Sequence, residues 1–361
     1  MKSTGKSTAK SKAKSKAKSA AALGSWALTK GRILKAKYEQ VFHSPETLID
    51  ATIEKAVGSS VAGKVKITKG ITNQVSAVTL ANGDELIVRI SRWEKSRFGT
   101  ERWAIEQCAK AGAPVPRVLF VDTIEHQGKP LNISIESKIQ GTPLDELAMG
   151  SISEDRLAEL LRKTGKVLSK IHSISTNGFG DLDEGGNGKY ESAGGMFSEK
   201  ELNEDQFIKV ARAVNLDPEI VKQSLALLNG YSVKGPAISP HLIHNDFTPR
   251  HVLVIGDEIS GILDFELAQG GDPVLDLAKW RYFFEDRFPL RYLIEGYDNS
   301  VAFSEEFEKR AHIWKLYIGL IHLNSYADKY RSGIPEWIER CKIQLTEAVG
   351  YFRQVSELQR N

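Results

Sequence analysis

The chain has few cysteines and no long apolar run. Cys108 and Cys341 are the two cysteines among 361 residues, too few for a disulfide framework, and neither stands at zinc-ligand spacing from a histidine. This favours a reducing, cytoplasmic setting. No stretch approaches the roughly 20 uninterrupted apolar residues that a membrane span needs, and the apolar segment 313–323 contains Lys315 and His322. We therefore expect no membrane insertion.

Acidic residues are absent from the first 38 positions, which hold eleven lysines and arginines. Because the whole chain carries a net charge of +3, the remainder carries −8. Residues 2–19 are almost entirely Lys, Ser, Ala and Thr and cannot bury a core, so residues 1–38 are expected to form a disordered basic tail. The tail is a tether for nucleic acid or a membrane surface, a targeting peptide, or a dispensable arm. The acidic body attracts cationic small molecules and repels nucleic acid, which leaves nucleic-acid binding to the tail alone.

Strand-like segments precede helical ones along the chain. The pattern predicts a helix from Ser44 to about Gly58, strands over 65–68, 75–80, 85–90, 118–121 and 132–139, a helix over 100–111, and mainly helices from Ser153 onward. This order predicts an α+β fold of two lobes, an antiparallel-sheet N-terminal lobe over 39–139 and a mainly helical C-terminal lobe over 140–361. The glycine-rich residues 177–198 are expected to form a long irregular loop.

Two carboxylates flank a predicted hairpin in the second half of the chain. Residues 244–254 read HNDFTPRHVLV, and residues 262–266 read ILDFE. Phosphoryl transfer needs one carboxylate that orients the attacking hydroxyl and accepts its proton, and others that hold Mg²⁺ between the phosphates. Asp246 and Asp264 suit these two tasks.

These residues resemble the aminoglycoside phosphotransferase family, whose catalytic loop reads His-x-Asp-x-x-x-x-Asn and whose metal carboxylate follows in an Ile-x-Asp strand. His244, Asp246 and Asp264 match that pattern. Residues 271–278, GDPVLDLA, are similar to the segment that follows the family's metal site. Further matches in the first half are Glu101, Ile105, Cys108, Gly112, Pro114 and Pro116. The resemblance covers about residues 60 to 350 and implies a two-lobed protein-kinase-like fold.

The resemblance also implies roles for individual residues. Asp246 would be the catalytic base, Asp264 and His251 would hold Mg²⁺, and Glu101 would pair with the basic residue of the third strand, Arg89. Gly70, Thr72 and Asn73 would position the phosphates of the donor, ATP or GTP. The chain departs from the family in having Arg89 where lysine is usual and His251 where asparagine is usual.

The function that follows is transfer of the γ-phosphate of a nucleoside triphosphate to a hydroxyl of a small, cationic molecule, such as an aminoglycoside-like antibiotic. Two alternatives stay open. One is a housekeeping kinase for choline, a sugar amine or homoserine, because the fold does not encode the acceptor. The other, motivated by Arg89 and His251, is a catalytically weak nucleotide-binding pseudokinase. A protein kinase is disfavoured because Asp264-Phe265-Glu266 lacks the following glycine and no Ala-Pro-Glu anchor follows.

Several other acids have structural or accessory interpretations. Asp272 and Asp276 are expected to cap a helix and to tie down the catalytic loop. Glu266, Glu285 and Asp286 are candidates for gripping a cationic acceptor, although exposed surface acids are the default.

Overall fold

The computed structural model describes residues 46–67, 73–91, 96–126, 128–150, 152–197, 202–234, 238–298, 306–327 and 335–358. The expectations for the basic tail, for Gly70 and for Thr72 lie outside these residues. The chain forms two compact units. The first contains the described residues up to Ser91 together with Asp122–Glu136, and the second contains the others. Within the described ranges, no helix combines the length and the apolar character that crossing a bilayer requires.

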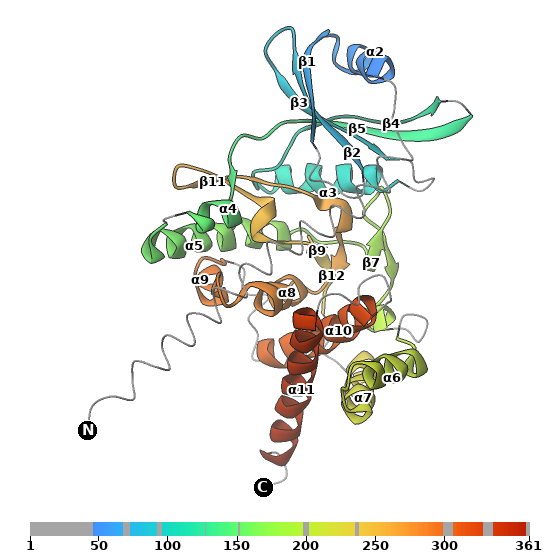
Figure 1. Ribbon diagram of the computed structural model, residues 1–361, viewed down its shortest axis with the longest axis vertical. Coiled ribbons are helices and arrows are strands. Elements are labelled where there is room, and N and C mark those ends of the chain that lie inside the picture. Colours follow the sequence, from blue (N-terminus) through green and yellow to red (C-terminus); the bar gives the residue numbers. More distant parts are fainter. Residues whose placement is uncertain are drawn as a thin grey trace. The chain divides into compact units, whose positions relative to one another are not determined.

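The first unit is built on one sheet with strand order β1-β2-β3-β5-β4, and helix α2 packs on β1 (Figure 1). Its elements are α2 (Glu46–Val57), β1 (Val61–Ile67), β2 (Gln74–Leu80), β3 (Glu85–Ser91), and the parts of β4 (Val118–His126) and β5 (Lys129–Ser137) that lie within Asp122–Glu136. β1, β2 and β3 pair antiparallel. The predicted Asn82-Gly83 turn is confirmed, with Gly83 at a φ of 88° and the Asn82 Oδ1 accepting a hydrogen bond from the Asp84 amide at 3.1 Å.

The second unit is mainly helical and carries short strands, in agreement with the predicted mixed class. Its helices are α3 (Phe98–Lys110), α4 (Leu144–Met149), α5 (Glu154–His172), α6 (Glu204–Ala213), α7 (Pro218–Lys234), α8 (Val274–Phe284), α9 (Leu290–Glu295), α10 (Phe307–Ala327) and α11 (Pro335–Leu358). Its strands and 3₁₀ turns are β6 (Thr142–Pro143), β7 (Phe179–Leu182), β8 (Gly188–Tyr190), η1 (Ala193–Phe197), β9 (His241–Ile243), η2 (Pro249–His251), β10 (Val252–Ile255), β11 (Glu258–Ile262), η3 (Phe265–Leu267) and β12 (Gln269–Gly271).

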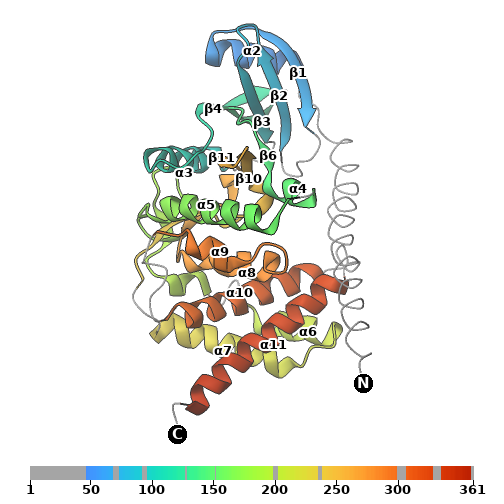
Figure 2. The same cartoon turned by 90° about the vertical axis from the view of Figure 1, so that its left-hand side faces the viewer.

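Helices α5, α9, α8 and α10 lie one below another in the second unit (Figure 2). α5 begins where the Ser153 hydroxyl accepts a hydrogen bond from the Arg156 amide, and its buried face includes Leu161 and Leu168. Gly165 lets α9 approach closely, because a Cβ at this position would lie 1.9 Å from the carbonyl oxygen of Leu293. α5 also packs against β9 and β11.

The expectation of a long irregular loop over residues 177–198 was wrong. The segment forms β7, β8 and η1, and β7 joins the sheet order β8-β7-β12-β9. The turn between β7 and β8 is closed by Asp183, whose Oδ1 accepts hydrogen bonds from the amides of Gly185 (2.8 Å) and Asn187 (2.9 Å). Hydrogen bonds from one side chain to backbone amides leave no periodic pattern in the sequence, so this turn could not be predicted from periodicity.

The predicted hairpin between the two carboxylates is confirmed. β10 and β11 pair antiparallel from Val252 opposite Ile262 to Ile255 opposite Glu258. β9 ends directly before the loop that carries Asp246, and β11 ends directly before Leu263 and Asp264. The hairpin reverses the chain direction, so that the residues after β11 lie near the residues after β9.

Candidate active site

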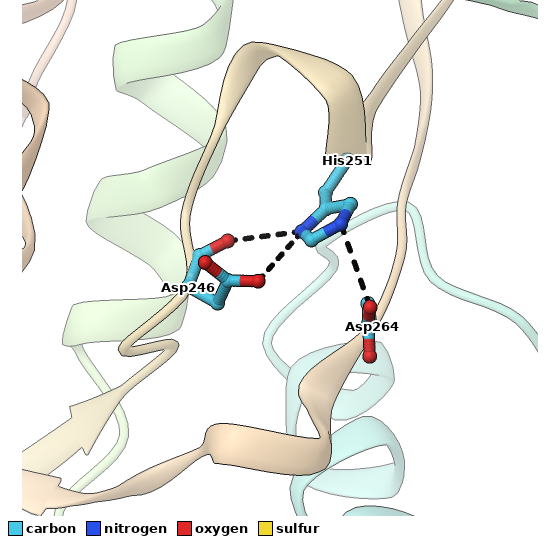
Figure 3. A group of neighbouring side chains, drawn as sticks. All are labelled: Asp246, His251 and Asp264. Carbon is cyan, nitrogen blue, oxygen red and sulfur yellow. Dashed lines mark hydrogen bonds and ion pairs between the residues drawn. The ribbon is translucent and has the colours of Figure 1, made fainter. Parts of the chain in front are cut away.

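Three side chains from the β9–β11 segment converge in the second unit (Figure 3). Asp246 lies on the loop after β9, His251 ends η2, and Asp264 follows β11. One ligand atom from each lies within 4.8 Å of the other two. The carboxylate side chains are 36% and 37% exposed, so both can be reached from solvent. The structure thus brings together the three residues that the sequence predicted as catalytic base and metal ligands.

The His251 ring lies between the two carboxylates. Its Nδ1 lies 3.0 Å from the carbonyl oxygen of Asp246, which can only accept, so Nδ1 carries a hydrogen. Its Nε2 faces the Asp264 Oδ2 at 3.4 Å. With the hydrogen on Nδ1, Nε2 is the ring nitrogen that can bind a cation together with the Asp264 carboxylate. A ring nitrogen anchored on a backbone carbonyl is typical of metal-ligating histidines.

Asp276 on α8 anchors the backbone directly before Asp246. Its two carboxylate oxygens accept hydrogen bonds from the amides of His244 and Asn245, each at 2.8 Å. Behind it, the His172 Nε2 lies 3.1 Å from Oδ2, and the His172 Nδ1 lies 2.7 Å from the Tyr297 hydroxyl. Burial would raise the pKa of Asp276, but the hydrogen bond from His172 and nearby positive charge outweigh it and lower the pKa. The predicted tying of the catalytic loop is confirmed.

Lys279, one turn further along α8, binds the same loop. Its ammonium donates to the carbonyl oxygen of Asn245 at 2.7 Å and also to the Asn245 Oδ1. Asn245 has a φ of 63°, in the left-handed region that costs a non-glycine residue roughly 1 kcal/mol. Burial lowers the pKa of Lys279, while the charges of Asp276 and Asp246 act against that change. Lys279 and Asp276 together hold this strained residue in place.

Asp264 is also held in the left-handed region, with a φ of 69°. The residue before it, Leu263, donates its amide to the His251 carbonyl at 2.9 Å, and its own carbonyl accepts from the His244 Nε2 at 3.0 Å. Burial lowers the pKa of His244, which favours the neutral ring, whose Nδ1 accepts a hydrogen bond from the Asp246 amide at 3.3 Å. The end of β11 is therefore fixed relative to the catalytic loop.

The donor set fits a divalent cation. Two carboxylates and one imidazole nitrogen lie close enough to share one ion, and carboxylate oxygens are the ligands that Mg²⁺ prefers. Imidazole is a softer donor than the amide oxygen that stands at the family's usual position. Asp264 and His251 therefore fit the expected metal mainly through the carboxylate, and the exposed Asp246 remains available as the predicted base.

The residues predicted to hold the nucleotide lie in both units. Arg89 on β3 is 8% exposed and lies 3.5 Å from Glu136 on β5, an ion pair within the first unit. Glu101 is buried on α3 of the second unit, so its pairing with Arg89 stays a prediction. Asn73 directly precedes β2.

The accessory acids have partners in the protein. Asp272 precedes Pro273, the N-cap of α8, and its Oδ1 accepts a hydrogen bond from the Val274 amide at 3.0 Å. Asp272 also binds Arg310 and the Trp314 Nε1, so the prediction of a structural role is confirmed. The Glu285 Oε2 accepts a hydrogen bond from the Leu290 amide at 3.1 Å, and Asp286 pairs with Arg340 at 3.0 Å. These two acids are already engaged on the surface of the second unit. Glu266 lies within η3.

The sequence interpretation missed Glu136, Asn245 and Lys279. Lys279 carries a usable signal, because residues three apart share one face of a helix and Asp276 was already assigned to the catalytic loop. Asn245 stands inside the motif but at a position that the motif leaves variable. Glu136 gives no signal beyond its place in a predicted strand.

Comparison with known proteins places this geometry in a family. The chain resembles the solved aminoglycoside phosphotransferase APH(4)-Ia, as a thermostable mutant without ligands, at 20% identity and a TM-score of 0.62, over 84% of this chain and 98% of the other. It resembles spectinomycin phosphotransferase APH(9)-Ia at 12% identity and 0.60, over 87% and 100%. It also resembles a fructosamine-3-kinase from Thermobifida fusca, described as putative, at 18% and 0.56, over 81% and 98%. A search of curated proteins gives no match.

These structural likenesses are below 25% identity and establish the fold, which is the kinase-like fold of the aminoglycoside phosphotransferases. The sequence itself matches the family model described as "Phosphotransferase enzyme family" over residues 65–307. That match includes Asp246, His251 and Asp264 and extends over more than half of the chain. The chain therefore belongs to the phosphotransferase enzyme family.

Proposed function

We propose that this protein transfers the γ-phosphate of ATP, or of GTP, to a hydroxyl group of a small molecule, with an aminoglycoside-like antibiotic as the leading acceptor. The observation that carries the proposal is the convergence of the half-exposed Asp246 and Asp264 on His251. Open carboxylates on a rigid loop are what in-line phosphoryl transfer requires of a protein.

Each residue has a role in this proposal. Asp246 orients the acceptor hydroxyl and takes up its proton as the oxygen attacks the γ-phosphorus, while the bond from that phosphorus to the β,γ-bridging oxygen breaks and the nucleoside diphosphate leaves. Asp264 and His251 would hold Mg²⁺, which would neutralise charge on the phosphates. In the first lobe, proposed to span 39–139, Gly70, Thr72, Asn73 and Arg89 bind the donor's phosphates, and Glu101 supports Arg89.

A nucleotide donor is supported by relatives. A structure of APH(4)-Ia that resembles this chain, with a TM-score of 0.61, is a ternary complex with AMP-PNP and hygromycin B. The spectinomycin phosphotransferase structure contains ADP and spectinomycin. The acceptor lobe is proposed to span 140–361, and residues 1–38 are proposed to be a tail outside the catalytic body.

A metabolite kinase is the second candidate. The likeness to the Thermobifida fusca fructosamine-3-kinase favours it, because that relative has nearly the same coverage as the antibiotic kinases. The site around Asp246 serves either acceptor class, so the distinction lies in the acceptor itself.

The test is a screen of nucleotide consumption by the purified full chain with Mg²⁺ and either ATP or GTP. The acceptors are hygromycin B, spectinomycin, gentamicin, choline, homoserine, and sugars with and without an amino group. We expect acceptor-dependent consumption with one class, and we expect Asp264→Ala to weaken binding of the metal–nucleotide complex as well as turnover. Lys309→Met, at an exposed lysine that pairs with Glu306, is the matched control. Nucleotide binding without any acceptor-dependent turnover would instead identify a pseudokinase.

A further inference from the structure

The side-chain amide of Asn245 is oriented by Lys279. The Lys279 ammonium donates to both the backbone carbonyl oxygen and the Oδ1 of Asn245. An ammonium group has three donors and no acceptor, so the oxygen of the amide must face Lys279 and the nitrogen must face away. The usual ambiguity between the two ends of an asparagine amide is thereby removed.

The amide nitrogen of Asn245 is left as a donor. Among the described residues, none pairs with the Asn245 Nδ2. Asn245 is half-buried, and its Nδ2 does not belong to the buried polar atoms that lack a partner, so its N–H bonds reach solvent. Asn245 directly precedes Asp246, whose carboxylate only accepts. A donor and an acceptor therefore stand on consecutive residues.

An exposed N–H donor distinguishes an oxygen from an ammonium group. The Lys279 ammonium holds the Asn245 Oδ1 and leaves the Nδ2 hydrogens for a group that can accept a hydrogen bond. An ammonium on the carbon next to the reacting hydroxyl has no lone pair and could not accept from Asn245. An oxygen at that carbon could accept.

We propose that Asn245, positioned by Lys279, selects acceptors whose phosphorylated hydroxyl has an oxygen, and not an ammonium group, on the neighbouring carbon. The inference rests on the proposed function and names its acceptor class. Asp246 accepts the proton of the reacting hydroxyl, while the Asn245 Nδ2 donates to the neighbouring hydroxyl, ether or carbonyl oxygen. Cationic groups of the acceptor then lie farther from the reacting hydroxyl, where the acidic body can attract them.

Two variants separate the two residues. Asn245→Asp keeps the size of the side chain and an oxygen for Lys279, but it replaces the N–H donors by a second oxygen. Lys279→Met releases the amide, which can then turn either end toward the acceptor. The controls are Asn203→Asp, where the side chain acts as a helix N-cap acceptor and aspartate serves equally well, and Lys309→Met on the surface.

The experiment uses whichever acceptor the full chain turns over, with the phosphorylated position located by phosphorus–proton NMR. Two analogues replace the oxygen on the neighbouring carbon by hydrogen or by an amino group. We expect kcat/KM of the wild type to fall by roughly fivefold to tenfold for the deoxy analogue, which is the worth of one hydrogen bond, and at least as much for the amino analogue. Asn245→Asp should reverse the order and favour the amino analogue. Lys279→Met should reduce the differences in kcat/KM among the three acceptors, and both controls should show the wild-type order.

The ratio of kcat/KM between analogues cancels any general loss of activity or of folded protein in a variant. A wild type that turns over all three acceptors equally, or an Asn245→Asp variant with the wild-type order, overturns this inference and leaves the proposed function intact. Absence of turnover with every acceptor overturns the proposed function itself. The wild-type comparison requires no variant, so a misfolded variant does not prevent a decision.

Discussion

The second unit contains two clusters of histidine and aspartate with opposite environments. In the closed cluster, His172 and Asp276 have fully buried side chains, and Asp276 accepts three hydrogen bonds between 2.8 and 3.1 Å. In the open cluster, Asp246 and Asp264 are more than a third exposed and lie 3.6 and 3.4 Å from ring nitrogens of His251. The aspartate oxygens therefore have close hydrogen-bond partners in the closed cluster and only distant ones in the open cluster.

The difference in exposure indicates a structural role for the closed cluster and a chemical role for the open cluster. A buried carboxylate whose oxygens are filled by protein donors has nothing left for a substrate, whereas a half-exposed carboxylate with distant partners can take a proton or a metal. The two clusters are nevertheless joined, because Asp276 binds the amides of the two residues directly before Asp246. A substitution in the open cluster should therefore lower activity and leave stability unchanged, and a substitution in the closed cluster should lower stability.

Asp246→Asn should have the largest effect, and it should fall on catalysis alone. The amide has the shape of the carboxylate but cannot accept the hydroxyl proton, so we expect kcat to fall between about 100-fold and 10,000-fold. Nucleotide affinity and the urea midpoint should stay close to those of the wild type, because the carboxylate is open to solvent. Steady-state kinetics, calorimetry with nucleotide and urea unfolding check the three parts. A large drop in stability would remove the distinction between the clusters.

Asp276→Asn should produce the converse result. The substituted side chain keeps one oxygen for the backbone amides of the catalytic loop and turns an N–H toward another donor, which leaves buried groups unpaired beside His172. We expect the free energy of unfolding to fall by about 3 to 5 kcal/mol, seen as a lower urea midpoint with an unchanged slope. Asn203→Asp serves as the control. A wild-type midpoint would show that the closed cluster does not support the fold.

The sequence was sufficient to predict the open cluster. His244, Asp246 and Asp264 stand at motif spacing, and the strand-like segments between them made a hairpin, and hence convergence, the natural expectation. The order of strand and helix signals also predicted the antiparallel sheet of the first unit and the mainly helical second unit. Local patterns sufficed here because these features depend on residues close together in the chain.

The link from Asp276 to the catalytic loop was predicted, but the packing of Asp276 against His172 and Tyr297 could not be. His172, Asp276 and Tyr297 come from three helical or loop segments about 100 and 20 residues apart, and no local pattern states that they meet. The pairing of Arg89 with Glu136 joins strands β3 and β5, which are not consecutive in the chain. The Asp183 turn replaced an expected loop through side-chain bonds that carry no periodicity. These features depend on tertiary packing.

Acid should weaken the closed cluster through Asp276. Its pKa is lowered in the folded protein, so the unfolded chain binds the proton more tightly. Its stabilising contribution is complete above the unfolded pKa of about 3.9 and is lost as the pH falls toward the folded pKa. Below about pH 3.9, the stability of the wild type should therefore fall more steeply than that of Asp276→Asn, by up to about 1.4 kcal/mol per pH unit. Urea midpoints between about pH 5 and pH 3 measure both slopes, and parallel slopes would contradict this.

Asp286→Asn should have the smallest effect. It tests whether this exposed acid binds the acceptor together with the open cluster. Asp286 is 80% exposed and pairs with Arg340, which also binds the carbonyl oxygen of Phe283. An exposed ion pair contributes less than about 1 kcal/mol, so the urea midpoint should hardly move. Because Arg340 already compensates the carboxylate, the KM for a cationic acceptor should change less than twofold. A tenfold rise in that KM would place Asp286 among the groups that bind the acceptor, and exposure alone would then not separate surface acids from functional ones.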